Sequence, residues 1–308
     1  MLGFYKTIDN AVVQTDSITD GCWVNAVSPT LDEMEYLIEQ LSLERDFVSA
    51  ALDEEESSRI EVEEEQTLII VDAPLATAEG KHLVYTTMPV GIIITPRNVV
   101  TVCLNETSAV TDIAKGFVKN VQTHMKTRFL LTILLRVAQS FLIRLKHINK
   151  MSSHMEMELQ KTMKNKDLVQ LMGLQKSLTY FSTSLKANEI TLEKILRGRV
   201  IRLYEEDQDL LEDVIIEFKQ AVEMSTIYST ILSHTMDATA SIINNSLNDV
   251  MKILTIMTTL LAIPSMIFSF YGMNMLDLDG YAPYTWFALL LSLVLVGAAG
   301  LFFWKKKF

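Results

Sequence analysis

Cysteine, proline and glycine are all scarce in this chain, whose 308 residues include two cysteines, six prolines and eleven glycines. Two cysteines are too few for a disulfide framework, and the spacing of Cys22 and Cys103 does not match a metal-binding motif. We expect both to be buried strand residues in a reducing compartment. The five histidines are scattered, and no nucleophile–base pair accompanies them. The sequence therefore does not indicate an enzyme, an organic cofactor or a nucleic-acid partner.

Charge is absent from two long runs near the C-terminus, 253–276 and 280–304. Each run exceeds the roughly 20 residues that a helix needs to cross a bilayer. Helices buried in soluble proteins are rarely apolar on every face over this length. We therefore predict transmembrane helices at 251–273 and 283–304. The apolar stretch 128–145 carries three arginines, each costing about 2.5–3.5 kcal/mol at mid-membrane, and is predicted to be a soluble amphipathic helix.

Lysines at the ends of these runs predict the orientation. Lys252 precedes the first run, and three lysines follow the second. Basic residues stay on the cytoplasmic side, so we expect both termini in the cytoplasm, an extracytoplasmic loop at 274–282 and a basic tail at 305–308. The first residues show no basic segment followed by an apolar core, and we expect no signal peptide. The predicted location is the cell (inner or plasma) membrane, as a multi-pass protein.

The first 105 residues alternate short apolar runs, such as "LVYTTMPV" and "GIIITP", with turn residues, and four of the six prolines lie there. Two helices interrupt this pattern. Thr30 and Glu33 form a capping box for the first, and Ser42 is expected to cap the second. Strands mixed with helices predict an α/β or α+β cytoplasmic domain over 1–120.

No proline occurs between Pro96 and Pro264, a pattern typical of long helices. We predict a cytoplasmic helical stalk over 121–250. Its last helix is expected to run without a break from about residue 200 to 272, and therefore into the membrane. At 1.5 Å per residue this helix is on the order of 110 Å long. A break at Asn244–Asn245 is the alternative.

Polar and small side chains, with one methionine, recur along the first span at steps of three and four residues. Such spacing places them on one face of a helix. This stripe consists of Asn248, Met251, Thr255, Thr258, Ala262, Ser265, Ser269 and Gly272. It fits a helix-packing seam, because small residues let membrane helices approach closely. It also fits the lining of a pore, which requires an oligomer since one helix cannot enclose a pore.

The tetrapeptide Tyr271-Gly272-Met273-Asn274 stands at the outer end of the first of the two spans. Together with the second span, the KKK tail, the long helix and the N-terminal α/β domain, it resembles the CorA family of magnesium channels. The amino-acid sequence is most similar to that family over "NDVMKILTIMTTL" and "YGMN". This resemblance implies a homopentameric funnel in which the long helix lines the pore with the stripe. It also implies a selectivity filter at Gly272, Met273 and Asn274.

An uncharged amide suits magnesium at such a filter. Mg²⁺ gives up its water reluctantly, and conduction requires favourable entry with easy exit. Amide oxygens of Asn274 can accept hydrogen bonds from coordinated water without holding the ion as tightly as carboxylates would. Asp277 and Asp279 follow just outside and would raise the local cation concentration. Alternatively, they only solvate the loop.

The resemblance further implies that cytosolic Mg²⁺ binds between subunits and favours the closed state. Asp213 falls at a sensor carboxylate of the family and Asp237 at an acidic position of the inner pore. The partner carboxylate from the N-terminal domain is not clearly matched. It falls near Ala50, which makes Asp53 and Glu54, a turn away, the candidates.

We therefore predict a channel for Mg²⁺ uptake driven by the membrane potential, with Co²⁺ and Ni²⁺ as substitutes. Mg²⁺ is both the transported ion and the regulatory ligand, and the partners are further copies of the chain, the lipid bilayer and divalent cations. One alternative is a zinc transporter of the same superfamily, in which the middle residue of the triplet usually differs. Another is a non-conducting, membrane-anchored sensor.

Overall fold

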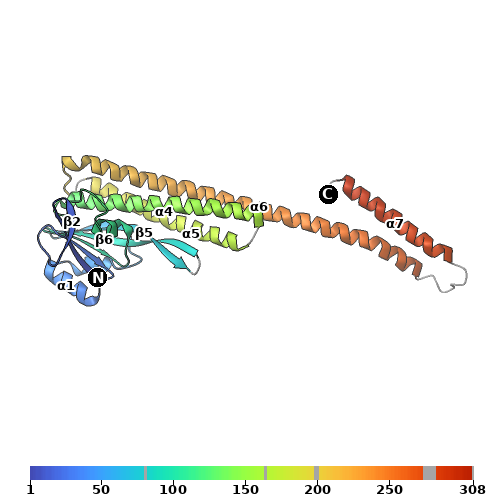
Figure 1. The fold of residues 1–308 in the computed structure, drawn as a ribbon, viewed down its shortest axis with the longest axis horizontal. Helices are drawn as coiled ribbons and strands as arrows, with labels where there is room; N and C mark the ends of the chain where they lie inside the picture. Colours follow the sequence, from blue (N-terminus) through green and yellow to red (C-terminus); the bar gives the residue numbers. More distant parts are fainter. Residues whose placement is uncertain (80–81, 163–164, 198–200, 273–281, 307–308) are drawn as a thin grey trace. The chain divides into compact units, whose positions relative to one another are not determined.

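The structure, a computed structural model, describes residues 1–79, 82–162, 165–197, 201–272 and 282–306. It divides the chain into two compact units, Met1–Met236 and Asp237–Phe308. The first unit holds a sheet with helices on both of its faces (Figure 1). The predicted domain boundaries, 1–120 and 121–250, remain predictions.

The sheet of the first unit has seven strands in the order β2-β1-β3-β7-β6-β5-β4. All neighbouring pairs are antiparallel except β3 and β7, which are parallel. The strands are β1 (Leu2–Ile8), β2 (Ala11–Thr15), β3 (Trp23–Val27), β4 (Arg59–Glu63), β5 (Gln66–Glu79), β6 (His82–Ile94) and β7 (Val99–Cys103). This mixed sheet with its helices confirms the predicted α/β class.

One strand, β6, replaces the two strands expected over "LVYTTMPV" and "GIIITP". Pro89 suggested a break between them. It pairs with Asp72 of β5, whereas the ladder between β6 and β7 begins one residue later, at Val90. Pro89 therefore lies where β6 has no partner on its β7 side, and its missing N–H interrupts nothing there.

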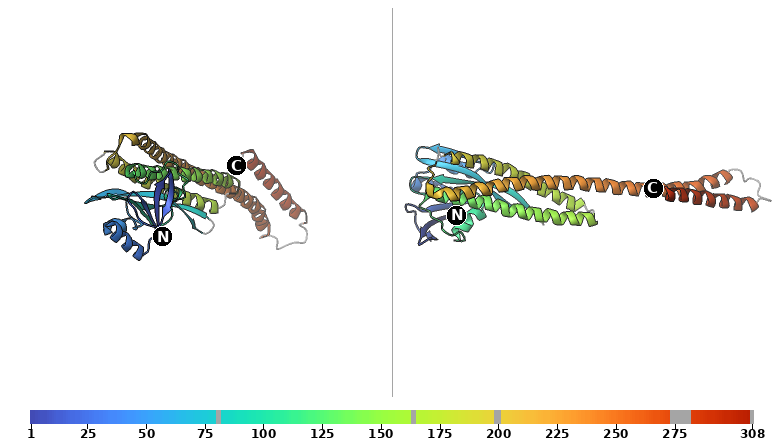
Figure 2. Two further views of the ribbon diagram at one scale, coloured as in Figure 1. Left: turned by 60° about the vertical axis from the view of Figure 1, so that its left-hand side comes forward. Right: turned by 90° about the horizontal axis from the view of Figure 1, so that it is seen from above.

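Alternation along the strands gives the sheet two buried faces. One face packs against the short helices α1 (Leu31–Leu41) and α2 (Arg45–Ala50). The other packs against α3 (Ser108–Ala114), α4 (Lys126–Thr162) and α5 (Asn165–Leu196). Figures 1 and 2 show α1 on the side of the sheet opposite α4.

Of the two capping predictions near α1, one is confirmed and the other is wrong. The capping box of Thr30 and Glu33 is present at the start of α1, and is confirmed. Ser42 does not cap α2. It is the C-cap of α1, with φ of 49°, and α2 begins after Glu44, whose described side chain makes no capping hydrogen bond. From the sequence, a serine between two helices could cap the C-terminus of the first or the N-terminus of the second. Here Ser42 takes the left-handed conformation that ends α1.

Both cysteines are free and fully buried. Cys103 ends β7, as expected for a strand residue. Cys22 is not in a strand, since it immediately precedes β3. Its thiol accepts a hydrogen bond from the Asn98 amide (3.1 Å), which also donates to the Thr19 and Cys22 carbonyl groups. The side chain of Asn98 thus holds the loop before β3.

The arginine-containing stretch 128–145 is part of α4, where it forms a helix of the soluble core. Phe129, Leu134 and Phe141 are buried there, and the Phe141 ring meets that of Phe181 on α5 edge-on, with ring centres 5.0 Å apart. The predicted amphipathic helix is confirmed.

Polar side chains of α5 reach the sheet. Asn188 exchanges two hydrogen bonds of 2.8 Å with the backbone of Asp72 on β5, and the Ser184 hydroxyl donates to Thr87 on β6 (2.9 Å). Burial raises the pKa of the Asp72 carboxyl. These contacts fix α5 against β5 and β6.

The long helix α6 runs from Gln208 to Gly272, 65 residues, after a short 3-10 turn at Glu205–Asp207. It continues through Asn244–Asn245, so the alternative of a break there is wrong. It also continues through Pro264, and it begins somewhat later than the predicted residue 200. Its first part is buried in the first unit, through Val214, Phe218, Ala221 and Leu232.

The second unit contains the rest of α6 and the helix α7 (Ala282–Lys305). The most apolar windows of α6 and α7 have mean hydropathies of 2.0 and 2.4, yet only 6% and 11% of their residues are buried. Apolar side chains exposed on this scale require a lipid or protein surface to cover them. The two helices therefore fit membrane spans better than core helices of a soluble protein.

Candidate ion pathway

The polar stripe lies on the part of α6 that belongs to the second unit. Every stripe residue before Gly272 is exposed there, and α6 ends at Gly272. The exposed members are Asn248, Met251, Thr255, Thr258, Ala262, Ser265 and Ser269. A polar face so exposed is available to line a water-filled path or to contact further copies of the chain.

Three hydroxyl groups of the stripe donate their protons to the backbone of the helix. The Oγ1 atoms of Thr255 and Thr258 donate to the carbonyl groups four residues earlier, each at 2.8 Å, and the Ser265 hydroxyl does the same at 3.0 Å. A hydroxyl has one proton and two lone pairs. Since the proton is committed to the helix backbone, these oxygens present acceptor lone pairs outward. Such a face suits the hydrogen atoms of water molecules around a cation.

The residues predicted to follow this stripe, Met273, Asn274, Asp277 and Asp279, lie outside the described residues. Their roles in a selectivity filter and an acidic outer loop therefore stay predictions.

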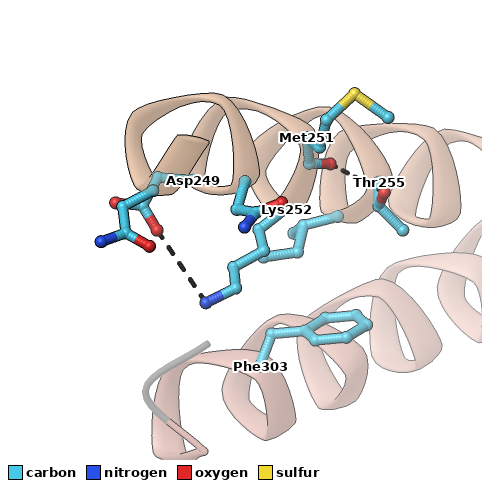
Figure 3. A pocket seen from close by; sticks show the side chains of 8 residues that line it. Asp249, Met251, Lys252, Thr255 and Phe303 are labelled. Atoms are coloured by element: carbon cyan, nitrogen blue, oxygen red, sulfur yellow. Dashed lines mark hydrogen bonds and ion pairs between the residues drawn. The ribbon is translucent and has the colours of Figure 1, made fainter. Parts of the chain in front are cut away.

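A cavity of about 600 Å³ lies in the second unit where α6 passes the end of α7 (Figure 3). Phe303 of α7 forms one side of it, and the Nζ atom of Lys252 lies 3.9 Å from the Asp249 carboxylate. The α6 residues that line it are Asn245, Asn248, Asp249, Met251, Lys252, Thr255 and Ile256. From the sequence, Lys252 indicated only the orientation of the chain in the membrane. The cavity could not be predicted, because it also requires Phe303, about fifty positions later.

The predicted regulatory carboxylates do not come together within the part of the chain that the structure describes. Asp213 is exposed on α6 in the first unit, and Asp53 and Glu54 are exposed after α2. Asp237 is exposed at the start of the second unit. Among the described residues, no three His, Cys, Asp or Glu side chains are placed to hold a metal ion. A site made from these residues would need carboxylates from more than one subunit.

Sequence reasoning missed the ion pair that holds the start of α6. Arg128 of α4 lies 3.4 Å from the buried carboxylate of Asp207, in the turn before α6. Only the Asp207 side chain is buried, so removing Arg128 would leave a buried carboxylate without its partner and destabilise the fold. The available signals were an arginine inside an apolar helix and a separate acidic stretch at 205–213, which could supply its partner.

Comparisons with known proteins agree over nearly the whole chain. The family described as "CorA-like Mg2+ transporter protein" matches residues 19–307. A curated relative from Methanocaldococcus jannaschii, "Cobalt/magnesium transport protein CorA", is 29% identical over 280 residues, 89% of this chain and 87% of the relative.

Solved structures agree with this match. The complete structure of the CorA magnesium transporter from Methanocaldococcus jannaschii has a TM-score of 0.82 and 25% identity, and covers 98% of this chain and 97% of its own. The full-length CmaX protein has a TM-score of 0.70 at 16% identity, covering 100% and 96%. At that identity the second likeness concerns the fold.

Proposed function

The chain belongs to the CorA-like Mg²⁺ transporter family, and from this premise we propose that it forms a homopentameric channel for Mg²⁺ uptake. The matched relatives are transport proteins and not enzymes, in agreement with the non-enzymatic prediction. The curated relative is named for cobalt and magnesium transport, which supports Co²⁺ as a second permeant ion. Ni²⁺ is proposed as a further substitute of similar size.

The observation that carries this proposal is the exposed stripe of α6. The hydroxyl oxygens of Thr255, Thr258 and Ser265 present acceptor lone pairs, and no member of the stripe carries a charge. Five such faces around one axis would line a path for a cation that keeps its water. The competing interpretation as a packing seam does not require outward-facing acceptors.

Selectivity is proposed to lie at the end of this path, in a ring of Gly272, Met273 and Asn274. The amide oxygens of Asn274 would accept hydrogen bonds from the water coordinated to Mg²⁺. Asp277 and Asp279, on the far side of the filter, would concentrate cations before entry.

The membrane potential is sufficient to drive this uptake. It contributes about 2.3 kcal/mol per elementary charge per 100 mV, hence about 7 kcal/mol for a divalent ion at about 150 mV. This requires the outer loop to face the exterior and both termini to lie in the cytoplasm, as the lysines near the membrane indicate.

A channel with this driving force needs a gate. We propose that cytosolic Mg²⁺ closes it by bridging carboxylates of adjacent subunits, with Asp213, Asp53 and Glu54 as the sensor candidates and Asp237 as an acidic position near the inner pore. Each of these side chains is exposed on the single chain and therefore available to a neighbouring subunit.

Ion flux into liposomes that contain the purified chain tests the function. A Mg²⁺-sensitive dye inside the vesicles should report uptake under an inside-negative potential, and Asn274→Ala should abolish it. Asn105→Ala, which removes an exposed amide from the first unit, is the matched control and should transport normally. Unchanged flux in Asn274→Ala would refute the filter assignment.

The same vesicles distinguish the alternatives. Uptake of Zn²⁺ in strong preference to Mg²⁺ and Co²⁺ would identify a zinc transporter. No uptake of any of the three ions by correctly assembled protein would identify a non-conducting sensor.

A further inference from the structure

The cavity beside Lys252 lies at the border between charged and uncharged sequence. Lys252 is the last charged residue before the run 253–276, and Phe303 comes two residues before the lysines of the tail. In the proposed orientation, on which this inference rests, the cavity is at the cytoplasmic surface of the bilayer. This is the depth of lipid headgroups.

The lining of the cavity is polar on one side and apolar on the other. Lys252 and Asn245 supply an ammonium group and an amide, whereas Ile256 and Phe303 supply apolar surface. Figure 3 shows the Lys252 side chain extended between the two helices, toward Asp249 at one end and above Phe303. A ligand that fills such a cavity needs a polar head and an apolar chain.

The charge of the cavity favours an anionic head. Asp249 is the carboxylate facing Lys252, but the two groups are 3.9 Å apart and the Asp249 side chain is 74% exposed. An exposed pair of this kind is weak and occupies one of the three ammonium protons. Lys305 and Lys306, exposed at the end of α7, add positive charge without an acidic residue nearby in sequence.

We propose that this cavity binds an anionic phospholipid, with its phosphate at Lys252 and Asn245 and the start of an acyl chain along Ile256 and Phe303. Basic pockets between transmembrane helices on the cytoplasmic side recognise headgroups in this way. Inorganic phosphate shares the charge chemistry but has no apolar part to contact Ile256 and Phe303. The apolar side of the cavity therefore favours the lipid as the source of the phosphate.

The lipid site borders the ion path on α6. Asn245, Asp249, Lys252 and Ile256 recur at steps of four, three and four, and form the face that meets Phe303. The stripe lies on the neighbouring face, and its members Asn248, Met251 and Thr255 also line the cavity. A bound lipid would link α6 to α7 at the edge of the path.

Tryptophan fluorescence offers a direct test, because Trp304 follows Phe303 and is 81% exposed. Trp286→Phe removes the other exposed tryptophan of α7, and Trp23 is fully buried in the first unit, away from lipid. The full-length variant is placed in phosphatidylcholine vesicles containing increasing fractions of brominated phosphatidylglycerol or brominated phosphatidylcholine. We expect half-maximal quenching of Trp304 at about a fivefold lower fraction of the anionic lipid.

Lys252→Gln in the same background should remove most of this preference. Lys219→Gln is the matched control, since it neutralises an exposed lysine of α6 in the first unit and should keep the preference. Size-exclusion chromatography of each variant confirms that assembly is intact.

Several outcomes would overturn the proposal. Equal quenching by the two lipids, or an unchanged preference in Lys252→Gln, would show that the cavity does not select an anionic lipid. Loss of the preference in Lys305→Gln/Lys306→Gln with retention in Lys252→Gln would indicate attraction to the tail alone. Displacement of the brominated anionic lipid by about 10 mM inorganic phosphate would identify a free-phosphate site. Ion flux is measured separately, so lost flux with intact lipid preference would refute only the proposed function.

Discussion

Thr101→Val would remove the hydroxyl that joins two buried polar side chains in the sheet. The Trp23 indole N–H donates to the Thr101 hydroxyl oxygen at 2.8 Å, and this hydroxyl donates to the Asn25 side-chain oxygen at 2.9 Å. Asn25 and Thr101 are direct partners across β3 and β7. Trp23 and Thr101 are fully buried, and Asn25 is 8% exposed. Water therefore has little access to replace either hydrogen bond.

The size of the effect follows from these contacts. Valine has nearly the same shape as threonine, so packing and strand preference change little. A buried group left without its hydrogen bond costs about 1–3 kcal/mol, and two such groups would be left. The extra buried methyl group returns about 0.8 kcal/mol. The net loss is about 1–5 kcal/mol, or roughly 2–20 °C in the melting temperature of a unit of this size.

Thermal unfolding in a Trp286→Phe/Trp304→Phe background, in which Trp23 is the one tryptophan of the sequence, measures this loss by fluorescence. Thr101→Ser is the matched control, because it keeps the hydroxyl and removes only a methyl group, at about 1 kcal/mol. If Thr101→Val unfolds at the same temperature as Thr101→Ser or above it, the two hydrogen bonds contribute nothing and the reasoning is wrong.

Three further predictions concern packing, pH and gating. Gly91→Ala would place a methyl group 2.3 Å from the Ala51 Cβ atom and should lower the unfolding free energy by about 1–3 kcal/mol. Adding Ala51→Gly should restore part of that loss, and no rescue in denaturant titrations would contradict the contact. Because burial raises the pKa of the Asp72 carboxyl, the folded state holds that proton more tightly than the unfolded state, and stability is lost as the pH rises above about 4. Asp72→Asn should therefore be more stable than the parent at pH 7 and no more stable near pH 4; an equal gain at both values would argue against the assignment. Asp213→Ala should shift closure by cytosolic Mg²⁺ to several-fold higher concentration in patch recordings, whereas parental block in that variant would exclude Asp213 from the sensor.

Much of the long helix could be predicted from the sequence because its signals are local. A helix continues wherever nothing breaks it, and residues 208–263 contain no proline and no glycine. The polar stripe was equally visible, since side chains three or four positions apart must share a face. The apolar runs predicted membrane spans by composition, without reference to any other part of the chain.

Other features depended on partners distant in sequence. Pro89 suggested the end of a strand, but β6 continues past it because β5 supplies hydrogen bonds along one whole edge. Arg128 suggested only an amphipathic helix, and its role as the partner of Asp207 appears when α4 packs beside the start of α6.

The sequence by itself therefore predicted the membrane spans and determined the continuous α6 and the polar face along it, because each depends on residues within a few turns of one another. The tertiary structure decided which groups meet. Trp23 reaches Thr101 across 78 residues, and Phe303 reaches the neighbourhood of Lys252 across about fifty. Local periodicity carries no information on such distant pairings, since they are selected by the packing of whole elements. The cavity beside Lys252 thus became visible only when α7 lay against α6.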